Sequence, residues 1–276
     1  PAPSAPPAAA PVEPKDPREG EAAYEQARQL MLAVDAILQD TAEQRTQARA
    51  QLVERNDFRS QLLTRGAMPL SRIALENMQA GTSAWQLEQP ARAHEVEGYA
   101  SHVSARSGDR VRLYVHVSTS SQVHYELYRM GYYQGFGGRF ITSGTPRAVE
   151  PQPSCPADAV TGLVECHWTA TFELSVSRSW VTGQYFFKLI RDDGFESYVP
   201  LVVREPAHYA PALVQSAVTT WQAYNVYGGS SLYRNNLPAD LGFTRKHADA
   251  VSFNRPYTCQ DLSSPDCQPG AGDFDL

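Results

Sequence analysis

The sequence predicts a multi-domain α+β protein, with an N-terminal helical segment, an antiparallel β-sandwich and then the start of an α/β domain. Three observations predict this order. Apolar residues first recur at helical spacing, short alternating strands follow, and the composition changes again near Tyr209. At 276 residues the chain exceeds one typical domain, so we expect two packed units and a tail.

Residues 1–17 are rich in Pro and Ala and contain almost no large apolar side chain, which predicts a disordered linker. Residues 18–90 form a predicted helical segment, because apolar side chains recur at helical spacing from Tyr24 to Leu38. This helix either forms a coiled coil or binds a partner, or else it packs on its own domain or acts as a spacer. We favour the second pair of roles. The chain lacks an initiator Met, so we expect its targeting segment to be missing.

Residues 91–205 are predicted to form the β-sandwich domain. Apolar and polar residues alternate over 111–119 and over 123–130, as in strands that bury one face. Gly-rich sequence at 134–138 predicts a turn, and a second turn at 193–194 predicts a hairpin between two apolar runs.

Residues 206–276 are expected to begin an α/β catalytic-like domain that is incomplete in this chain. The run ALVQSAVTTWQAYNVYGGSSLY places a short apolar stretch before a polar, aromatic and Gly-rich one. This order is typical of a buried strand whose carboxyl end carries a functional loop. Too few residues follow to complete a sheet with helices on both faces, so we expect the chain to be truncated.

Composition and charge narrow the classes of partner. The formal net charge is -6 and basic residues are interspersed with acidic ones, which argues against nucleic acid and anionic lipid. No apolar stretch approaches the length of a membrane span. A small-molecule substrate remains allowed, as do a homo-oligomer and a membrane tether through a missing N-terminal segment.

The four cysteines fall into two close pairs, Cys155 with Cys166 and Cys259 with Cys267. Two disulfides are the favoured interpretation, and they predict an extracytoplasmic protein that is periplasmic, lipid-anchored or secreted. A four-thiolate zinc site and free structural thiols are the alternatives. Neither pair has the short spacing of a zinc knuckle.

Three runs carry a family resemblance: EGYAS at 97–101, ELYRMGYYQGFGGR at 126–139 and TTWQAYNVYGGSSLY at 219–233. Together they resemble the C-terminal region of the N,N-dimethylformamidase large (beta) subunit family, over roughly residues 96–257. The resemblance implies a β-sandwich joined to an α/β domain of the glutamine-amidotransferase-like type. It also implies hydrolysis of a C–N bond in a small linear amide.

The resemblance further implies an Fe(III) site held by two tyrosines and one glutamate. Tyr224 in WQAYN and Tyr257 in FNRPY match the two tyrosines, and the glutamate is expected beyond Leu276. Asn225 is then a candidate to orient water or substrate. Arg255 either binds a carboxylate or oxyanion, or supports a loop. We therefore expect Tyr224 and Tyr257 to bind the metal, and Asn225 and Arg255 to act as catalytic residues.

Phenolate oxygen is a hard anionic donor that suits a hard ferric ion and must lose its proton to bind. A bound metal then polarises the amide carbonyl and activates water. Fourteen tyrosines are present and most must be structural, so the neighbouring Tyr227 and Tyr233 are the competing assignments.

A binding protein is the alternative function, namely an exported carbohydrate- or envelope-binding β-sandwich without catalysis. Four side chains of the RMGYY region could stack on a sugar: Tyr128, Arg129, Tyr132 and Tyr133. The same run lacks the Lys-Ser/Thr ending of a phosphate loop and lies in strand-rich sequence. No HExxH spacing and no GxSxG elbow occurs anywhere in the chain.

Overall fold

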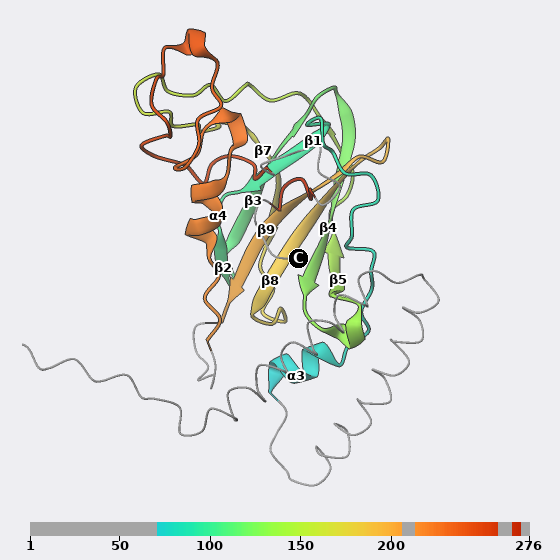
Figure 1. Ribbon diagram of the computed structural model, residues 1–276. Helices are drawn as coiled ribbons and strands as arrows, with labels where there is room; N and C mark the ends of the chain where they lie inside the picture. The colour runs from blue at the N-terminus through green and yellow to red at the C-terminus, as the bar shows by residue number, and fades with distance from the viewer. Residues whose placement is uncertain (1–70, 206–212, 259–266, 272–276) are drawn as a thin grey trace, which may run out of the picture. The chain divides into compact units, whose positions relative to one another are not determined.

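The computed structural model describes residues 71–205, 213–258 and 267–271 (Figure 1). The predicted linker over 1–17 and residues 18–70 of the predicted helical segment lie outside these residues. The described remainder of that segment, residues 71–90, is helical only from Arg72 to Asn77, so the prediction of helix is wrong for residues 78–90. In chain order the helices and strands are α3 Arg72–Asn77, β1 Val96–Ala100, β2 Ser104–Arg106, β3 Arg110–Val117, β4 Ser121–Met130, η1 Tyr133–Gly135, β5 Gly138–Ser143, β6 Arg147–Val149, β7 Ala170–Ser175, β8 Gly183–Arg191, β9 Glu196–Arg204, α4 Val218–Tyr224, η2 Tyr227–Gly229 and η3 Ala239–Leu241.

Two β-sheets pack face to face, and this confirms the predicted β-sandwich. The smaller sheet has the strand order β1-β3-β7, and the larger has the order β2-β9-β8-β4-β5, with β6 also paired to β4. The strands pair antiparallel except β2 with β9, which run parallel. The hairpin predicted around residues 193–194 is the β8–β9 pair, with Ile190 opposite Glu196.

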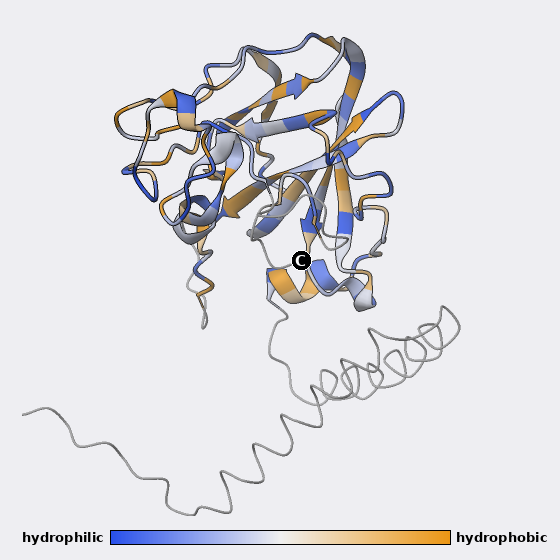
Figure 2. Cartoon of the chain, turned by 45° about the horizontal axis from the view of Figure 1, so that its top comes forward, coloured by the Kyte–Doolittle hydropathy of each residue, from blue (hydrophilic) through white to orange (hydrophobic). Residues whose placement is uncertain are grey.

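The core lies between the two sheets and follows from the alternation of hydrophobic and hydrophilic residues along the strands, whose hydropathy Figure 2 shows residue by residue. Every second residue of β3 is fully buried, from Val111 to Val117, while the residues between them are exposed or half-buried. The larger sheet contributes apolar side chains from its central strands, among them Leu127, Tyr185, Phe187, Leu189, Val199 and Leu201.

Strands β8 and β9 are buried on both faces, which explains why they appear in the sequence as nearly continuous apolar runs. Their second face is covered by a small cluster outside the main core. Phe186 and Tyr198 pack there with Trp85, Trp221 and Ala271. Side chains from the segment before β1, from α4 and from residues 267–271 thus close this face of the sheet.

A buried ion pair attaches the segment before β1 to the sheet. Lys188 Nζ lies 2.9 Å from a carboxylate oxygen of Glu196, and both residues are less than 10% exposed. The same ammonium donates to the carbonyl oxygens of Ala84 and Gln86, and Glu196 accepts from the backbone of Glu88. Each charge is therefore paired and hydrogen-bonded, as burial in a sheet requires.

Gly270 allows residues 267–271 to pack directly on β9. Its φ is +85°, and a Cβ at this position would lie 1.8 Å from the carbonyl oxygen of Tyr198. The Tyr198 amide donates to the carbonyl of Pro269 at 2.9 Å. Only a glycine fits so close to another backbone in this conformation.

The sequence prediction of a buried strand before WQAYN is wrong. Leu213 and Val214 are 94% and 84% exposed, and helix α4 follows from Val218 to Tyr224. The apolar run is short, and in the described residues it has no strand beside it that could satisfy its backbone. Trp221 and Gln222 instead face inward at helical positions.

Candidate metal and active site

Asn225 brings the two candidate tyrosine segments together. Its side-chain amide donates to the carbonyl of Pro256 at 2.9 Å and accepts from the backbone amide of Thr258 at 3.2 Å. These two backbone groups flank Tyr257, and Asn225 itself directly follows Tyr224. Because Asn225 is only 2% exposed, its hydrogen bonds replace water and fix the backbone on both sides of Tyr257.

Arg255 supports the loop that follows α4. Its guanidinium is fully buried and donates to the carbonyl oxygens of Asn225, Tyr227 and Ser230, each at 3.0 Å. Burial lowers the pKa of Arg255 to about 10, while nearby phenol groups act in the opposite direction. The sequence left two roles open for Arg255, namely binding an oxyanion and supporting a loop. The geometry is that of the loop-supporting role.

The two candidate ligand tyrosines each carry a hydroxyl group without a hydrogen-bond partner in the described residues. Tyr224 is 37% exposed and its ring stacks on Tyr233, with ring centroids 4.4 Å apart. Tyr257 is half-buried, and burial raises its pKa while the guanidinium of Arg255 opposes that rise. Within the described part of the chain, neither hydroxyl has a hydrogen-bond partner, so both are available to another ligand.

Tyr227, the first competing assignment, is already engaged. Its hydroxyl donates to a carboxylate oxygen of Glu97 at 2.7 Å. Burial raises its pKa, and the adjacent carboxylate raises it further. Tyr233, the second, is 64% exposed and serves as the stacking partner of Tyr224.

The disulfide loop holds the segment that carries Tyr257. The structure contains the predicted bond between Cys155 and Cys166. The Cys166 amide donates to the carbonyl of Asn254 at 2.7 Å, and the Glu165 carboxylate accepts from the side chains of Ser252 and Asn254. These two hydrogen bonds lower the pKa of Glu165. Cys259, the predicted partner of Cys267, lies outside the described residues, so that pairing stays a prediction.

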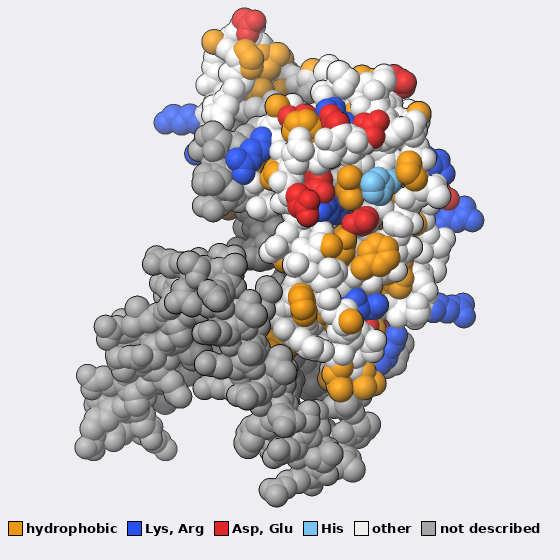
Figure 3. Space-filling model, turned by 90° about the vertical axis from the view of Figure 1, so that its right-hand side faces the viewer, with side chains coloured by type: hydrophobic (Ala, Val, Ile, Leu, Met, Phe, Trp, Pro, Cys, Tyr) orange, Lys and Arg blue, Asp and Glu red, His pale blue; other side chains and the backbone are white. Residues whose placement is uncertain are grey.

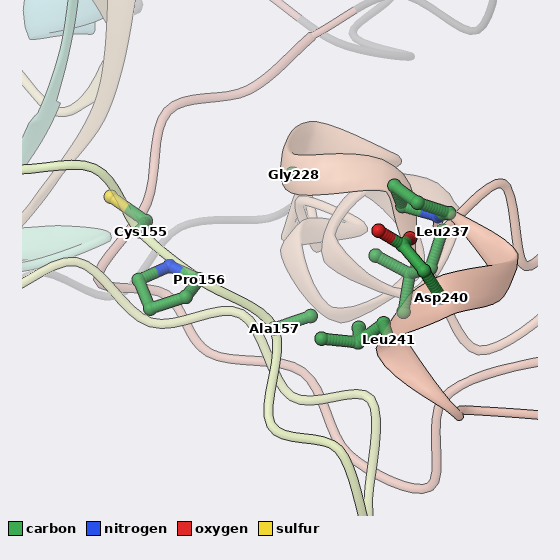
Figure 4. Close-up of a pocket in the computed structure, with 8 residues that line it drawn as sticks. Cys155, Pro156, Ala157, Gly228, Leu237, Asp240 and Leu241 are labelled. Carbon is green, nitrogen blue, oxygen red and sulfur yellow. The ribbon is translucent and has the colours of Figure 1, made fainter.

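A cavity of about 410 Å³ lies beside the disulfide, between the loop after Cys155 and the segment after η2 (Figure 4). Its walls are mainly aliphatic and include one carboxylate. They are formed by Cys155, Pro156, Ala157, Gly228, Leu237, Pro238, Asp240 and Leu241. Gly228 packs closely on Val164, where a Cβ would approach to 2.6 Å at a φ of +74°. The close backbone approach at this glycine is thus to the disulfide loop.

The RMGYY region is a buried structural network. Arg129 Nη1 donates to the Tyr133 hydroxyl at 2.8 Å, and that hydroxyl donates to Glu76 of α3, also at 2.8 Å. Arg139 donates to the same carboxylate at 2.6 Å. Burial raises the pKa of Glu76, but its bonds from Arg139 and Tyr133 lower it overall. The run therefore joins α3 to the turn between β4 and β5.

This burial removes the sugar-stacking surface on which the binding alternative depended. Tyr128, Arg129 and Tyr133 are at most 3% exposed, and only Tyr132 of the four side chains reaches solvent, at 42%. Stacking on a ligand needs an accessible ring face. That interpretation of the run is wrong for the three buried residues.

The surface agrees with the mixed charge of the sequence. On the face seen in Figure 3, acidic and basic side chains are scattered among uncharged ones, without a continuous basic stripe. No helix in the described residues has the length and apolar character that crossing a membrane requires. Within the same residues, no three His, Cys, Asp or Glu side chains gather as a metal-binding group.

Sequence reasoning missed Glu97 and Glu165, which hold the two site segments from the sandwich side. Both contacts span long separations in sequence, 130 residues for Glu97 with Tyr227 and 87 for Glu165 with Ser252. One signal was present for Glu97, since a carboxylate within an otherwise apolar strand must find a partner.

Three of the solved structures that are similar to this chain are only distantly so. An alkylpurine DNA glycosylase from Pseudomonas fluorescens is 10% identical, covers 40% of this chain and 31% of its own, and has a TM-score of 0.26. A cycloisomaltooligosaccharide glucanotransferase from Paenibacillus sp. is 8% identical over 47% of this chain and 18% of its own, with a TM-score of 0.26. An uncharacterized protein from Bacillus anthracis str. Ames is 7% identical over 44% of this chain and 96% of its own, with a TM-score of 0.25.

The chain spans less than a third of each of the first two proteins, and likenesses at this level do not bear on its function. No curated protein sequence matches it. A family model described as N,N-dimethylformamidase beta subunit-like, C-terminal, matches residues 124–274, which is more than half of the chain. This match includes the WQAYN and FNRPY runs with their two tyrosines. The chain therefore belongs to the N,N-dimethylformamidase beta subunit-like family.

Proposed function

We propose that this protein contributes to a dimethylformamidase-like, metal-dependent hydrolase that cleaves the C–N bond of a small amide. The observation that carries the proposal is the side chain of Asn225, which joins the segments of Tyr224 and Tyr257. Both tyrosine hydroxyls lack a hydrogen-bond partner in the described residues, unlike that of Tyr227. The family match supports a dimethylformamidase-like reaction.

The residues present fit a ferric ion in donor chemistry. Phenolate oxygens are hard anionic ligands, and Tyr224 and Tyr257 are the two that would hold the metal. The third ligand that we propose is a glutamate beyond Leu276. When bound, the ion supplies Lewis-acid polarisation of the amide carbonyl. Burial opposes ionisation of the Tyr257 phenol. The nearby cation of Arg255 acts in the opposite direction and favours the phenolate form that metal binding requires.

The remaining residues keep the site in shape. Asn225 has both polar atoms of its side chain committed to the protein, so its proposed role is to fix the two tyrosines rather than to bind water. Arg255 fixes the loop from Asn225 to Ser230 through its three carbonyl contacts.

The finer features of the family belong to the same proposal. We place residues 206–276 at the start of a glutamine-amidotransferase-like α/β domain, which the family resemblance implies. The disulfide between Cys155 and Cys166 supports an extracytoplasmic location. Tethering to a membrane and assembly into a homo-oligomer remain compatible proposals.

The test is metal content and visible absorption of protein expressed from the full-length gene and purified without added metal. Three variants accompany the wild type: Tyr224→Phe, Tyr257→Phe and the matched control Tyr233→Phe, whose exposed ring stacks on Tyr224. We expect a tyrosinate-to-iron absorption band that weakens or shifts in the first two variants and persists in the control. Colourless protein that takes up no iron on reconstitution would overturn the metal assignment.

A further inference from the structure

Glu97 on β1 lies at the centre of a three-residue cluster that nothing in the proposed chemistry uses. One of its carboxylate oxygens lies 2.6 Å from His94 Nδ1, and the other accepts the Tyr227 hydroxyl at 2.7 Å. The rings of His94 and Tyr227 meet edge to face, with centroids 6.0 Å apart. Glu97 is only 9% exposed, so both of its oxygens depend on these partners.

Tyr227 is held at three points, and Glu97 provides the one that comes from the sandwich. The Tyr227 amide donates to Asn225 Oδ1 at 3.1 Å, and its carbonyl accepts from Arg255 at 3.0 Å. Its hydroxyl reaches across to Glu97. The contact at Asn225 is shared with the backbone of Thr258, so movement of Tyr227 would be transmitted to the segment of Tyr257.

His94 is the member of the cluster that meets solvent. Its side chain is 46% exposed, whereas that of Glu97 is 12% exposed. Its backbone has a φ of +61°, a left-handed conformation that is uncommon outside glycine and that surrounding contacts must maintain. The charged and titratable groups that face it are Glu95, Glu97 and Tyr227.

We propose that Glu97 is a positioning residue for the tyrosine site, and that His94 makes its hold on Tyr227 dependent on pH. The effect of Glu97 on iron binding rests on the proposed function. Its effect on the loop from Tyr227 to Ser231 does not. In metal-free protein, Glu97 and His94 fix the loop from Tyr227 to Ser231. In iron-binding protein, the same hold keeps Asn225 in place between the two candidate ligands.

The sign of the pH effect follows from the hydrogen bond. Glu97 raises the pKa of His94 above its ordinary value of 6.5, while burial opposes that rise. A group whose pKa is higher in the folded state contributes stability that is complete below its unfolded pKa. That contribution is lost as the pH rises through the folded pKa. The hold is therefore strongest in mildly acidic solution and weakens above neutrality.

Hydrogen exchange and iron affinity together test the proposal on the full-length protein. The variants are Glu97→Leu, Tyr227→Phe and Glu97→Gln, with Glu173→Gln as a control that removes an exposed, paired glutamate of β7. Exchange is followed at the amide of Gly229, which donates to the carbonyl of Val226, and at the amide of Leu232, which donates to the carbonyl of Ala223 on α4. NMR titration of His94 is recorded in the metal-free protein.

We expect Glu97→Leu and Tyr227→Phe to lower both the protection factors and the iron affinity by about tenfold, as loss of one buried charge-assisted hydrogen bond implies. Glu97→Gln, which keeps an acceptor for Tyr227, should restore most of both and abolish the dependence of protection on pH. In that variant the pKa of His94 should fall. Glu173→Gln should change none of these.

Two results would overturn the proposal. One is unchanged protection in both Glu97→Leu and Tyr227→Phe, which would mean that the loop does not depend on Glu97. The other is reduced protection with wild-type iron affinity, which would make Glu97 merely structural. Wild-type protein that binds no iron contradicts the proposed function alone, and the exchange data then still decide whether Glu97 holds the loop.

Discussion

Replacement of Arg255 by Met would remove a buried cation and put an apolar side chain of similar length in its place. Three backbone carbonyls would lose their donor, namely those of Asn225, Tyr227 and Ser230. Each buried acceptor left without a partner costs about 2 kcal/mol. The variant also no longer carries the cost of burying the cation, which offsets part of this loss. A pKa lowered from 12.5 to about 10 corresponds to a cost of about 3 kcal/mol.

We therefore expect Arg255→Met to lower the free energy of unfolding by about 3 kcal/mol, measured by urea denaturation. Hydrogen exchange should show the loss of protection concentrated in the loop after α4. Arg234→Met is the matched control, because Arg234 lies in the same region with an exposed side chain and should change stability by less than about 0.5 kcal/mol. The reasoning would be refuted by an Arg255→Met protein as stable as the control, with an unchanged exchange pattern.

Three further predictions concern the sandwich and its attachments. Replacing both Cys155 and Cys166 by Ser should lower the free energy of unfolding by about 3 kcal/mol in urea. Wild-type protein that is equally stable in reducing and oxidising buffer would contradict this. Gly270→Ala should lower the urea midpoint and expose Tyr198 amide hydrogen to exchange, because a Cβ there meets the β9 backbone; full retention of that protection would show that the contact is absent. Lys188→Met should cost about 3 to 5 kcal/mol by leaving Glu196 unpaired, with recovery when Glu196→Gln is added; no recovery would mean that the pair does not matter.

The sandwich could be predicted from sequence because its signals are local. Alternation over 111–119 gives β3, and the turn at 193–194 separates the two apolar runs that become β8 and β9. The Cys155–Cys166 pair is equally local, since the two residues are 11 positions apart in a Pro-containing loop. In each case the pattern and the structural contact involve the same short stretch of chain.

The segment before WQAYN shows where local pattern fails. A short apolar run can form either a strand or a helix, and which one forms depends on the neighbours available to it. In this chain Val218 to Tyr224 form a helix, and Trp221 packs on the far face of the larger sheet. The strand interpretation required a sheet partner that the sequence pattern itself could not supply.

The residues assigned to the candidate site stay a prediction, and the structure adds how their segments are held. The family resemblance pointed to Tyr224 and Tyr257, and the structure joins their segments through Asn225. The partners of Arg255 and the contact between Glu97 and Tyr227 could not be predicted, because they link segments far apart in sequence. Such pairings depend on the packed fold rather than on any spacing of residue types.

The most direct test of the proposed site is an anomalous difference map at the iron absorption edge, from crystals of the full-length protein loaded with iron. We predict a single strong peak within bonding distance of the phenol oxygens of both Tyr224 and Tyr257, with no peak in the double Phe variant. A map with no peak at these oxygens, or with iron bound elsewhere while both tyrosines stay unliganded, would contradict the proposed metal site.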